Sequence, residues 1–203
     1  MKKESWDSAL FSLRVERESI ERLMGYIPPD QFGQAVDLLK SCGKVITCAS
    51  GSSGIAAKKF AHSLCCINRP ALFMVPSEAV HGGLGCVCAR DVVVMVSRGG
   101  KTVELLPIIR AVRERGAFLI GVTENAESPL AQASSVVLPL KIERESDPCD
   151  VMATASFVAT IALFDALLAA LMTETGYTIG QFAQIHPGGA VGERLKEFEG
   201  QTV

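Results

Sequence analysis

The segment Lys44-Val-Ile-Thr-Cys-Ala-Ser-Gly-Ser-Ser-Gly54 decides the fold of this chain. Its first half is a short apolar run rich in β-branched residues, which predicts a strand buried on both faces. Its second half is a turn of glycine and serine, and a helical pattern follows from residue 55 to residue 66. A buried strand that leads through such a turn into a helix is the repeating unit of a parallel α/β sheet.

Four further apolar runs repeat the pattern, at residues 71–75, 91–96, 117–122 and 135–140. Helical patterns lie between them, one of which ends near residue 115 and another of which covers 128–133. Continuous apolar strands that alternate with helices indicate a parallel sheet covered on both faces. The sequence therefore predicts an α/β fold, a doubly wound three-layer sandwich with a five-stranded parallel sheet.

Additional helices are predicted on both sides of this core. An amphipathic pattern from residue 5 to about residue 27 places its apolar side chains, among them Leu10, Leu13 and Met24, mostly on one face. The 203 residues fit a single domain, 1–203. We expect it to comprise N-terminal helices over 5–42, the core over 44–140 and C-terminal helices over 150–197.

The longest apolar run, Ala153–Met172, has the length of a bilayer-spanning helix. Asp165 near its middle and its acidic flanks argue against a membrane, so a helix buried on all sides is the preferred interpretation. A mean hydropathy of +0.29 calls for such a helix or for a large subunit interface. The first six residues contain no apolar signal core, so a cytoplasmic protein is expected.

Charge and cysteine content exclude several classes of protein. With 20 basic and 22 acidic residues the net charge is −2, which gives no electrostatic footprint for nucleic acid. The seven cysteines form no CxxC pair, and Cys65 and Cys66 are adjacent, so neither a zinc site nor a disulfide framework is indicated. We expect them to be small, buried, reduced side chains. The three histidines have no ligand spacing, and no metal is expected.

Two serine- and glycine-rich loops come directly before helices, at the ends of the first and third strands. Glycine lets the backbone approach an anion, and a helix N-terminus presents free N–H groups. The candidates to hold a phosphate are Ser52 and Ser53 in the first loop and Ser97 and Thr102 in the second. A plain glycine-serine turn with a helix cap is the alternative. Neither GxGxxG nor GxxxxGK[ST] is present, so no nucleotide cofactor is indicated.

Three more segments contain candidate functional residues. His81 lies in a glycine-rich stretch after the second strand, and Glu145 lies in a charged run after the fifth. A hydrogen-bonded loop histidine and a solvated charged run are the alternatives. His186 begins the sequence His-Pro-Gly-Gly, which is unusual for a simple connection between helices.

These motifs together resemble SIS (sugar isomerase) domains, which bind phosphosugars. The stretch Glu78–Gly85, the helix start with Thr154 and Ser156, and His186-Pro-Gly-Gly are similar, more narrowly, to arabinose-5-phosphate isomerases. The likeness runs from about residue 10 to residue 197. It implies a flavodoxin-like strand order, a homotetramer, and interconversion of D-ribulose 5-phosphate and D-arabinose 5-phosphate. Long family members carry a pair of CBS domains after the SIS domain, and this sequence resembles a short form without them.

The resemblance also implies a catalytic set. Glu104, Glu145 and His186 match three family residues, while Ser52 occupies the place of the family lysine. The second loop departs as well, since it reads Ser97-Arg-Gly-Gly-Lys-Thr. We hypothesise that Arg98 or Lys101 supplies part of the missing positive charge. The full set of expected substrate and phosphate contacts is Ser52, Ser53, His81, Ser97, Arg98, Lys101 and Thr102.

Two functions of different class follow from this resemblance. The first is an aldose–ketose isomerase that needs no cofactor or metal, with Glu104 as the base and with Glu145 and His186 assisting. Its sites are expected to assemble from neighbouring subunits. The second is a phosphosugar sensor without turnover, which the serine at position 52 favours. An isomerase of another sugar phosphate is a third possibility.

Overall fold

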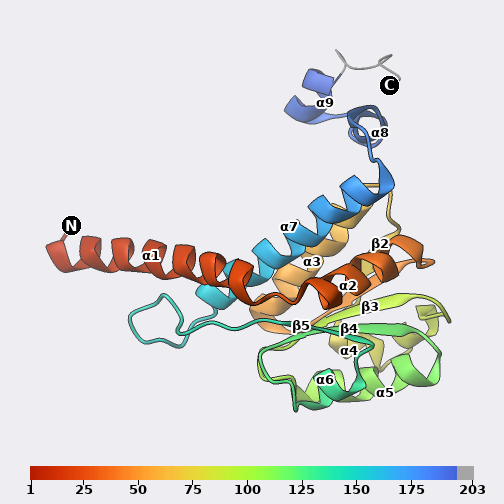
Figure 1. Ribbon diagram of the computed structural model, residues 1–203, viewed down its shortest axis with the longest axis horizontal. Helices are drawn as coiled ribbons and strands as arrows, with labels where there is room; N and C mark the ends of the chain where they lie inside the picture. The colour runs from red at the N-terminus through yellow and green to blue at the C-terminus, as the bar shows by residue number, and fades with distance from the viewer. Residues whose placement is uncertain (196–203) are drawn as a thin grey trace.

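Five parallel strands form the centre of the fold (Figure 1). The computed structural model describes residues 1–195, apart from the side chains of residues 190, 191 and 194. The strand order is β2-β1-β3-β4-β5, which confirms the doubly wound, flavodoxin-like sheet. The strands are β1 (Val45–Cys48), β2 (Ala71–Phe73), β3 (Val92–Val96), β4 (Phe118–Thr123) and β5 (Val136–Pro139).

The central strands are buried because helices cover both faces of the sheet. Every residue of β1 and β3 is buried, and Val45 pairs with Ala71 on one side and with Val92 on the other. The edge strands β2 and β5 are only partly covered. This gradient explains why the central strands are continuously apolar.

Two helical layers enclose the sheet and give it two separate apolar cores. Figure 1 shows α2, α3 and α7 on one side of the sheet and α4, α5 and α6 on the other. The first three are α2 (Pro29–Ser41), α3 (Gly51–Cys65) and α7 (Ala155–Thr175), and the others are α4 (Pro76–Ala79), α5 (Leu106–Glu114) and α6 (Pro129–Ala133). The three-layer prediction is therefore confirmed.

The first helix, α1 (Lys3–Tyr26), is the helix predicted over residues 5 to about 27, but little of its apolar face is covered. Only Val15, Ser19 and Leu23 are buried, while Leu13 is 65% and Met24 is 75% exposed. Figure 1 shows the reason, since the N-terminal part of α1 extends beyond the sheet and its helices. The amphipathic pattern thus predicted the helix correctly, and most of its apolar face is left open within one chain.

The long apolar helix α7 is not buried on all sides, which corrects the prediction. One face packs on α1, α2 and α3, and the other is open. It is the one helix in the described chain that is long and apolar enough to cross a membrane, and 44% of that window is buried. Asp165 lies on the open side, half-exposed, and forms an ion pair with Lys59 of α3.

The cysteines also differ from expectation. All seven are free, but Cys48 alone among them is buried, and Cys65, Cys86, Cys88 and Cys149 are exposed. Burial raises the pKa of the Cys48 thiol to about 12, which keeps it protonated. Most of these cysteines lie at helix ends and in loops, and composition alone does not reveal that placement.

The stacked pair Phe60–Phe164 joins α3 to α7, with ring centroids 4.3 Å apart and both residues at 0% exposure. We predict that Phe164→Ala lowers the free energy of unfolding by about 3–5 kcal/mol, because it leaves a cavity in the core. Chemical denaturation measures this loss. Phe118→Ala is the control, since Phe118 is 41% exposed. An equally large loss of unfolding free energy in the control would show that the stacked pair stabilises the fold no more than a partly exposed phenylalanine does.

Candidate functional site

A cleft of about 410 Å³ opens at the carboxyl ends of β1, β2 and β3. The chain leaves β1 toward β2 on one side and later returns to β3 on the other, so this edge is the topological switch point, where open α/β sheets bind ligands. We call it the switch-point cleft. Its lining consists of Ala49, Ser50, Gly51, Gly54, Ile55, Lys58, Phe73, Val75, Pro76, Ser77 and Glu104.

The N-terminus of α3 forms one wall of this cleft. Gly51, with a φ of 59°, starts the helix, and Gly54 packs so closely that a Cβ there would lie 2.7 Å from the carbonyl oxygen of Ala49. The first amides of a helix have no intrahelical acceptor and suit an anion. Ser52 and Ser53 lie within this first turn, half-buried, and not in the preceding loop as predicted. The cleft lining itself contains Ser50 and Gly51.

The second predicted loop, Ser97–Thr102, is fixed by its own hydroxyl groups. The Ser97 and Thr102 hydroxyl oxygens are 2.7 Å apart, and the Gly100 amide donates to Ser97 Oγ at 3.1 Å. Gly100 has a φ of 65°, and a Cβ there would lie 2.0 Å from Ser128 Oγ. Ser97 is buried, so these hydroxyls shape the loop. Their role in holding phosphate stays a prediction.

Glu104 reaches the cleft because the predicted helix is interrupted after this loop. Residues Val103–Leu105 form a single 3₁₀ turn, η2, and α5 begins only at Leu106. Pro107 lies in the first turn of α5, where a missing N–H is tolerated. The break leaves the carboxylate of Glu104 exposed on the cleft wall, opposite α3. Of the three predicted catalytic residues, it is the one in the cleft lining.

Glu145 is buried, with 2% of its surface exposed, and it holds the start of α7. Its Oε2 accepts hydrogen bonds from the amides of Thr154 at 2.9 Å and Ser156 at 3.1 Å. Its Oε1 accepts from Nη1 of Arg98 at 3.1 Å. A carboxylate at this position complements the positive end of the helix dipole and caps its free amides. The charged run around Glu145 was therefore only partly a solvated surface, and the catalytic role of Glu145 stays a prediction.

Arg98 is shared between two carboxylates. Its Nε donates to Glu124 at 2.9 Å, and its Nη1 donates to Glu145. The hydrogen bond to Glu124 raises the pKa of Arg98. The guanidinium thus joins the loop after β3 to those after β4 and β5. Lys101 is exposed and does not belong to the cleft lining. Neither residue is placed to supply a cation inside this cleft.

The two candidate histidines, His81 and His186, lie away from the cleft lining. His81 is exposed in the turn after α4, next to the 3₁₀ turn η1 (Gly83–Cys86). His186 ends α8 (Ile179–Ile185) just before α9 (Gly189–Leu195), and its ring stacks on Phe182 with centroids 3.8 Å apart. Residues 196 and 197, the end of the predicted helical segment, lie outside the described residues.

The position of α7 separates His186 from the two glutamates within one chain. The 21 residues of α7 span about 30 Å from the cap at Glu145 to its far end. Figure 1 shows α8 and α9 beyond that far end, away from the loop before α7. A single chain therefore does not bring His186 to Glu104 and Glu145.

Lys58 and Ser50 are cleft residues that the sequence analysis missed. The signal was present in α3, where Gly51, Gly54, Ile55 and Lys58 have the i, i+3, i+4, i+7 spacing of one helix face. Among the described residues, no group of three or more His, Cys, Asp or Glu could hold a metal ion.

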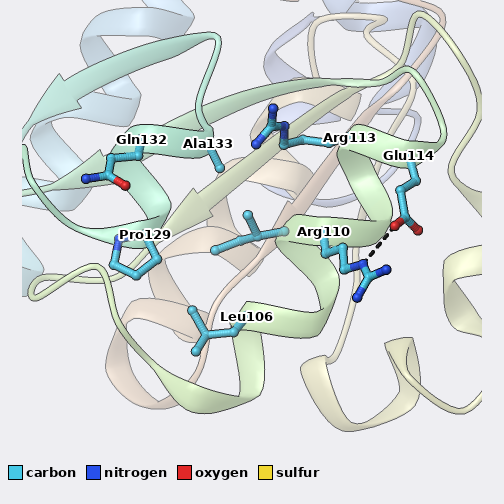
Figure 2. A pocket seen from close by; sticks show the side chains of 8 residues that line it. Leu106, Arg110, Arg113, Glu114, Pro129, Gln132 and Ala133 are labelled. Atoms are coloured by element: carbon cyan, nitrogen blue, oxygen red, sulfur yellow. Dashed lines mark hydrogen bonds and ion pairs between the residues drawn. The ribbon is translucent and has the colours of Figure 1, made fainter.

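A larger cavity of about 690 Å³ lies between α5 and α6 and contains none of the predicted residues. Figure 2 shows Arg110, Arg113 and Glu114 of α5 on one side and Pro129 and Gln132 of α6 on the other. Arg110 Nε donates to Glu114 at 2.8 Å. This cavity lies on the outer helical layer, away from the carboxyl edge of the sheet.

The fold defines a doubly wound α/β protein with a cleft at the edge where such sheets bind ligands. The chain belongs to the SIS domain family, whose model matches residues 38–170. The resemblance found in the sequence is thereby confirmed.

Relatives and solved structures share this fold over most of the chain. The arabinose 5-phosphate isomerase KdsD of Pseudomonas aeruginosa is 37% identical over 93% of this chain, which spans only 58% of that relative. A Listeria monocytogenes structure, provisionally assigned as a sugar-phosphate isomerase, is 42% identical with a TM-score of 0.89, covering 93% of this chain and 100% of its own. The Escherichia coli CFT073 protein c3406, solved in complex with arabinose 5-phosphate, is 28% identical with a TM-score of 0.85. The match covers 92% of this chain and 100% of that protein's chain.

Glu145 offers a direct test of the cap on α7. We predict that Glu145→Ala lowers the free energy of unfolding by about 2 kcal/mol, because it leaves buried amides of α7 without an acceptor. The measurement is chemical denaturation. Glu143→Ala is a matched control, since Glu143 pairs with Arg22 on the exposed surface. Equal effects in both variants would contradict the assignment.

Proposed function

We propose that this chain is a sugar-phosphate isomerase that interconverts D-arabinose 5-phosphate and D-ribulose 5-phosphate. The observation that carries the proposal is the exposed carboxylate of Glu104 in a cleft whose opposite wall is the start of α3. A base and an anion-binding helix end in one cleft are what isomerisation of a phosphosugar requires. The arabinose 5-phosphate isomerases among the relatives and the arabinose 5-phosphate complex of a structural neighbour support this choice.

The proposed reaction moves one proton between neighbouring carbons. Glu104 takes the proton from C2 of the aldose, the C–H electron pair becomes the C1=C2 bond of an enediol, and the carbonyl oxygen takes up a proton. Return of the proton to C1, with loss of the hydroxyl proton at C2, gives the ketose. The start of α3 and the Ser97–Thr102 loop hold the phosphate at one end, so that the sugar carbons lie beside Glu104.

Glu145 and His186 have different tasks in this proposal. Glu145 fixes Arg98 and the start of α7, which orients the loop before Glu104. His186 can reach a switch-point cleft only from a neighbouring subunit, because within its own chain the length of α7 separates it from Glu145 and Glu104. We therefore propose a homo-oligomer, a tetramer by resemblance. The exposed apolar residues of α1 and the open face of α7 support a subunit interface.

A phosphosugar sensor without turnover is the second candidate. Ser52 favours it, because a neutral hydroxyl stands where the resembling isomerases have a lysine. Such a sensor would bind in the same cleft and leave its ligand unchanged. An isomerase of another sugar phosphate would use the same residues on a longer or shorter sugar.

The first test is turnover. We predict that the protein converts arabinose 5-phosphate to the ketose and that Glu104→Gln lowers kcat by about 10²- to 10⁴-fold, because the proton-transfer base is lost. A colorimetric ketose assay measures both. Glu114→Gln, an exposed glutamate of α5, is the control and should keep full activity. Saturable binding with no product would favour the sensor.

The second test asks whether sites are shared between subunits. We predict that Glu104→Gln and His186→Asn are each inactive and that mixed oligomers regain about a quarter of the native activity. Random mixing leaves about one site in four with both native residues when these come from different chains. The two variants are mixed, dissociated in mild denaturant and reassembled before assay. No recovery, with native-sized oligomers re-formed, would refute the shared site.

A further inference from the structure

Lys58 lies on the face of α3 that lines the switch-point cleft. Gly51, Gly54, Ile55 and Lys58 form one stripe along two turns of the helix, and all four belong to the cleft lining. The first three cannot carry charge. Lys58 therefore decides the electrostatic character of this wall.

The charges in the cleft are few and opposed. Among the described residues that line it, Lys58 is the single cation and Glu104 is the single anion. A sugar phosphate carries close to two negative charges at neutral pH, so Glu104 alone would repel it. The cleft needs a positive group to receive such a ligand, and this lining offers one.

Two other cations near the site, Arg98 and Lys59, are already paired, and Lys101 lies outside the cleft lining. Arg98 is held by Glu124 and Glu145, and the neighbouring Lys59 forms an ion pair with Asp165 on the other side of α3. Lys58, by contrast, has no ion pair or side-chain hydrogen bond within the described part of the chain. Its ammonium group is thus free to meet a ligand.

Lys58 is exposed and shares the cleft lining with Gly51 and Gly54 at the start of α3. Side chains on a helix lean toward its N-terminus and cover the preceding turn. The flexible four-carbon arm of Lys58 can therefore reach over Gly54 toward the amides at residues 51–53. Helix-end amides and an ammonium group that converge from one side form a site for a phosphate monoester.

We propose that Lys58 binds the phosphate group of the sugar phosphate in the switch-point cleft. It compensates for the neutral Ser52 and for the negative charge of Glu104. The inference rests on the proposed function for the class of ligand, but it does not require turnover. An isomerase and a sensor would use Lys58 in the same way.

The experiment compares three variants of the full chain by isothermal titration with arabinose 5-phosphate, ribulose 5-phosphate and inorganic phosphate. Lys58→Met removes the charge, and Lys58→Arg retains it. Arg113→Met is the matched control, because it removes one cation from the larger cavity between α5 and α6 (Figure 2). Thermal unfolding checks that each variant is folded.

We expect Lys58→Met to raise the Kd for the bound sugar phosphate by about 10- to 100-fold, because one charge-assisted hydrogen bond is lost. Lys58→Arg and Arg113→Met should stay within about threefold of the native Kd. In turnover, Lys58→Met should raise KM far more than it lowers kcat, because a phosphate contact is equally strong in ground and transition states.

Each other outcome has a defined meaning. An unchanged Kd in Lys58→Met, or an equally large loss of affinity in Arg113→Met, would overturn the proposed role of Lys58. If the native protein still converts arabinose 5-phosphate, the isomerase proposal stands in spite of that result. Binding that depends on Lys58 without turnover of either pentose phosphate would support Lys58 and refute that isomerase. A native protein that binds none of the three probes would overturn both proposals.

Discussion

The buried carboxylate of Glu145 is the interaction on which the arrangement of this protein depends. It is almost fully removed from water, and it is neutralised by the amides at the start of α7 and by Arg98. A buried charge is tolerated only when such partners surround it. Three segments that are far apart in sequence, the loop after β3, the chain after β5 and the start of α7, are thereby fixed at one edge of the sheet. That edge is also where the switch-point cleft lies.

The direction of α7 follows from this anchor and determines what one chain can do alone. With its start at the carboxyl edge of the sheet, α7 carries the chain away from the cleft to α8 beyond its far end, and His186 is the residue that ends α8. The open face of α7 and the projecting part of α1 leave apolar surface in the single chain. The homo-oligomer that we propose would account both for the separation of His186 from Glu104 and for the uncovered apolar surface.

The strands were predictable because helices on both faces force them to be continuously apolar. Their flavodoxin-like order, and Glu104 as a candidate site residue, came from the resemblance to SIS domains and to arabinose-5-phosphate isomerases, because no local pattern marks either of them. The partners of Glu145 were not predictable, since Arg98 lies 47 residues away in the sequence and no local pattern marks the pair. Lys58 was overlooked because its signal is the helical spacing of one face of α3 and not a motif. The covering of α1 could not be predicted, since amphipathicity tells which face is apolar and not what packs on it.

The shared position of Arg98 has a consequence for how this protein can change over generations. Replacing Arg98 alone would leave a buried negative charge without its counter-ion, and replacing Glu145 alone would leave the start of α7 uncapped while Arg98 keeps its ion pair with Glu124. Each single replacement therefore carries a cost that a change of both positions together can avoid. We expect related sequences to keep the arginine and the glutamate together or to exchange both, while the surface of α5 and the tip of α1 vary freely.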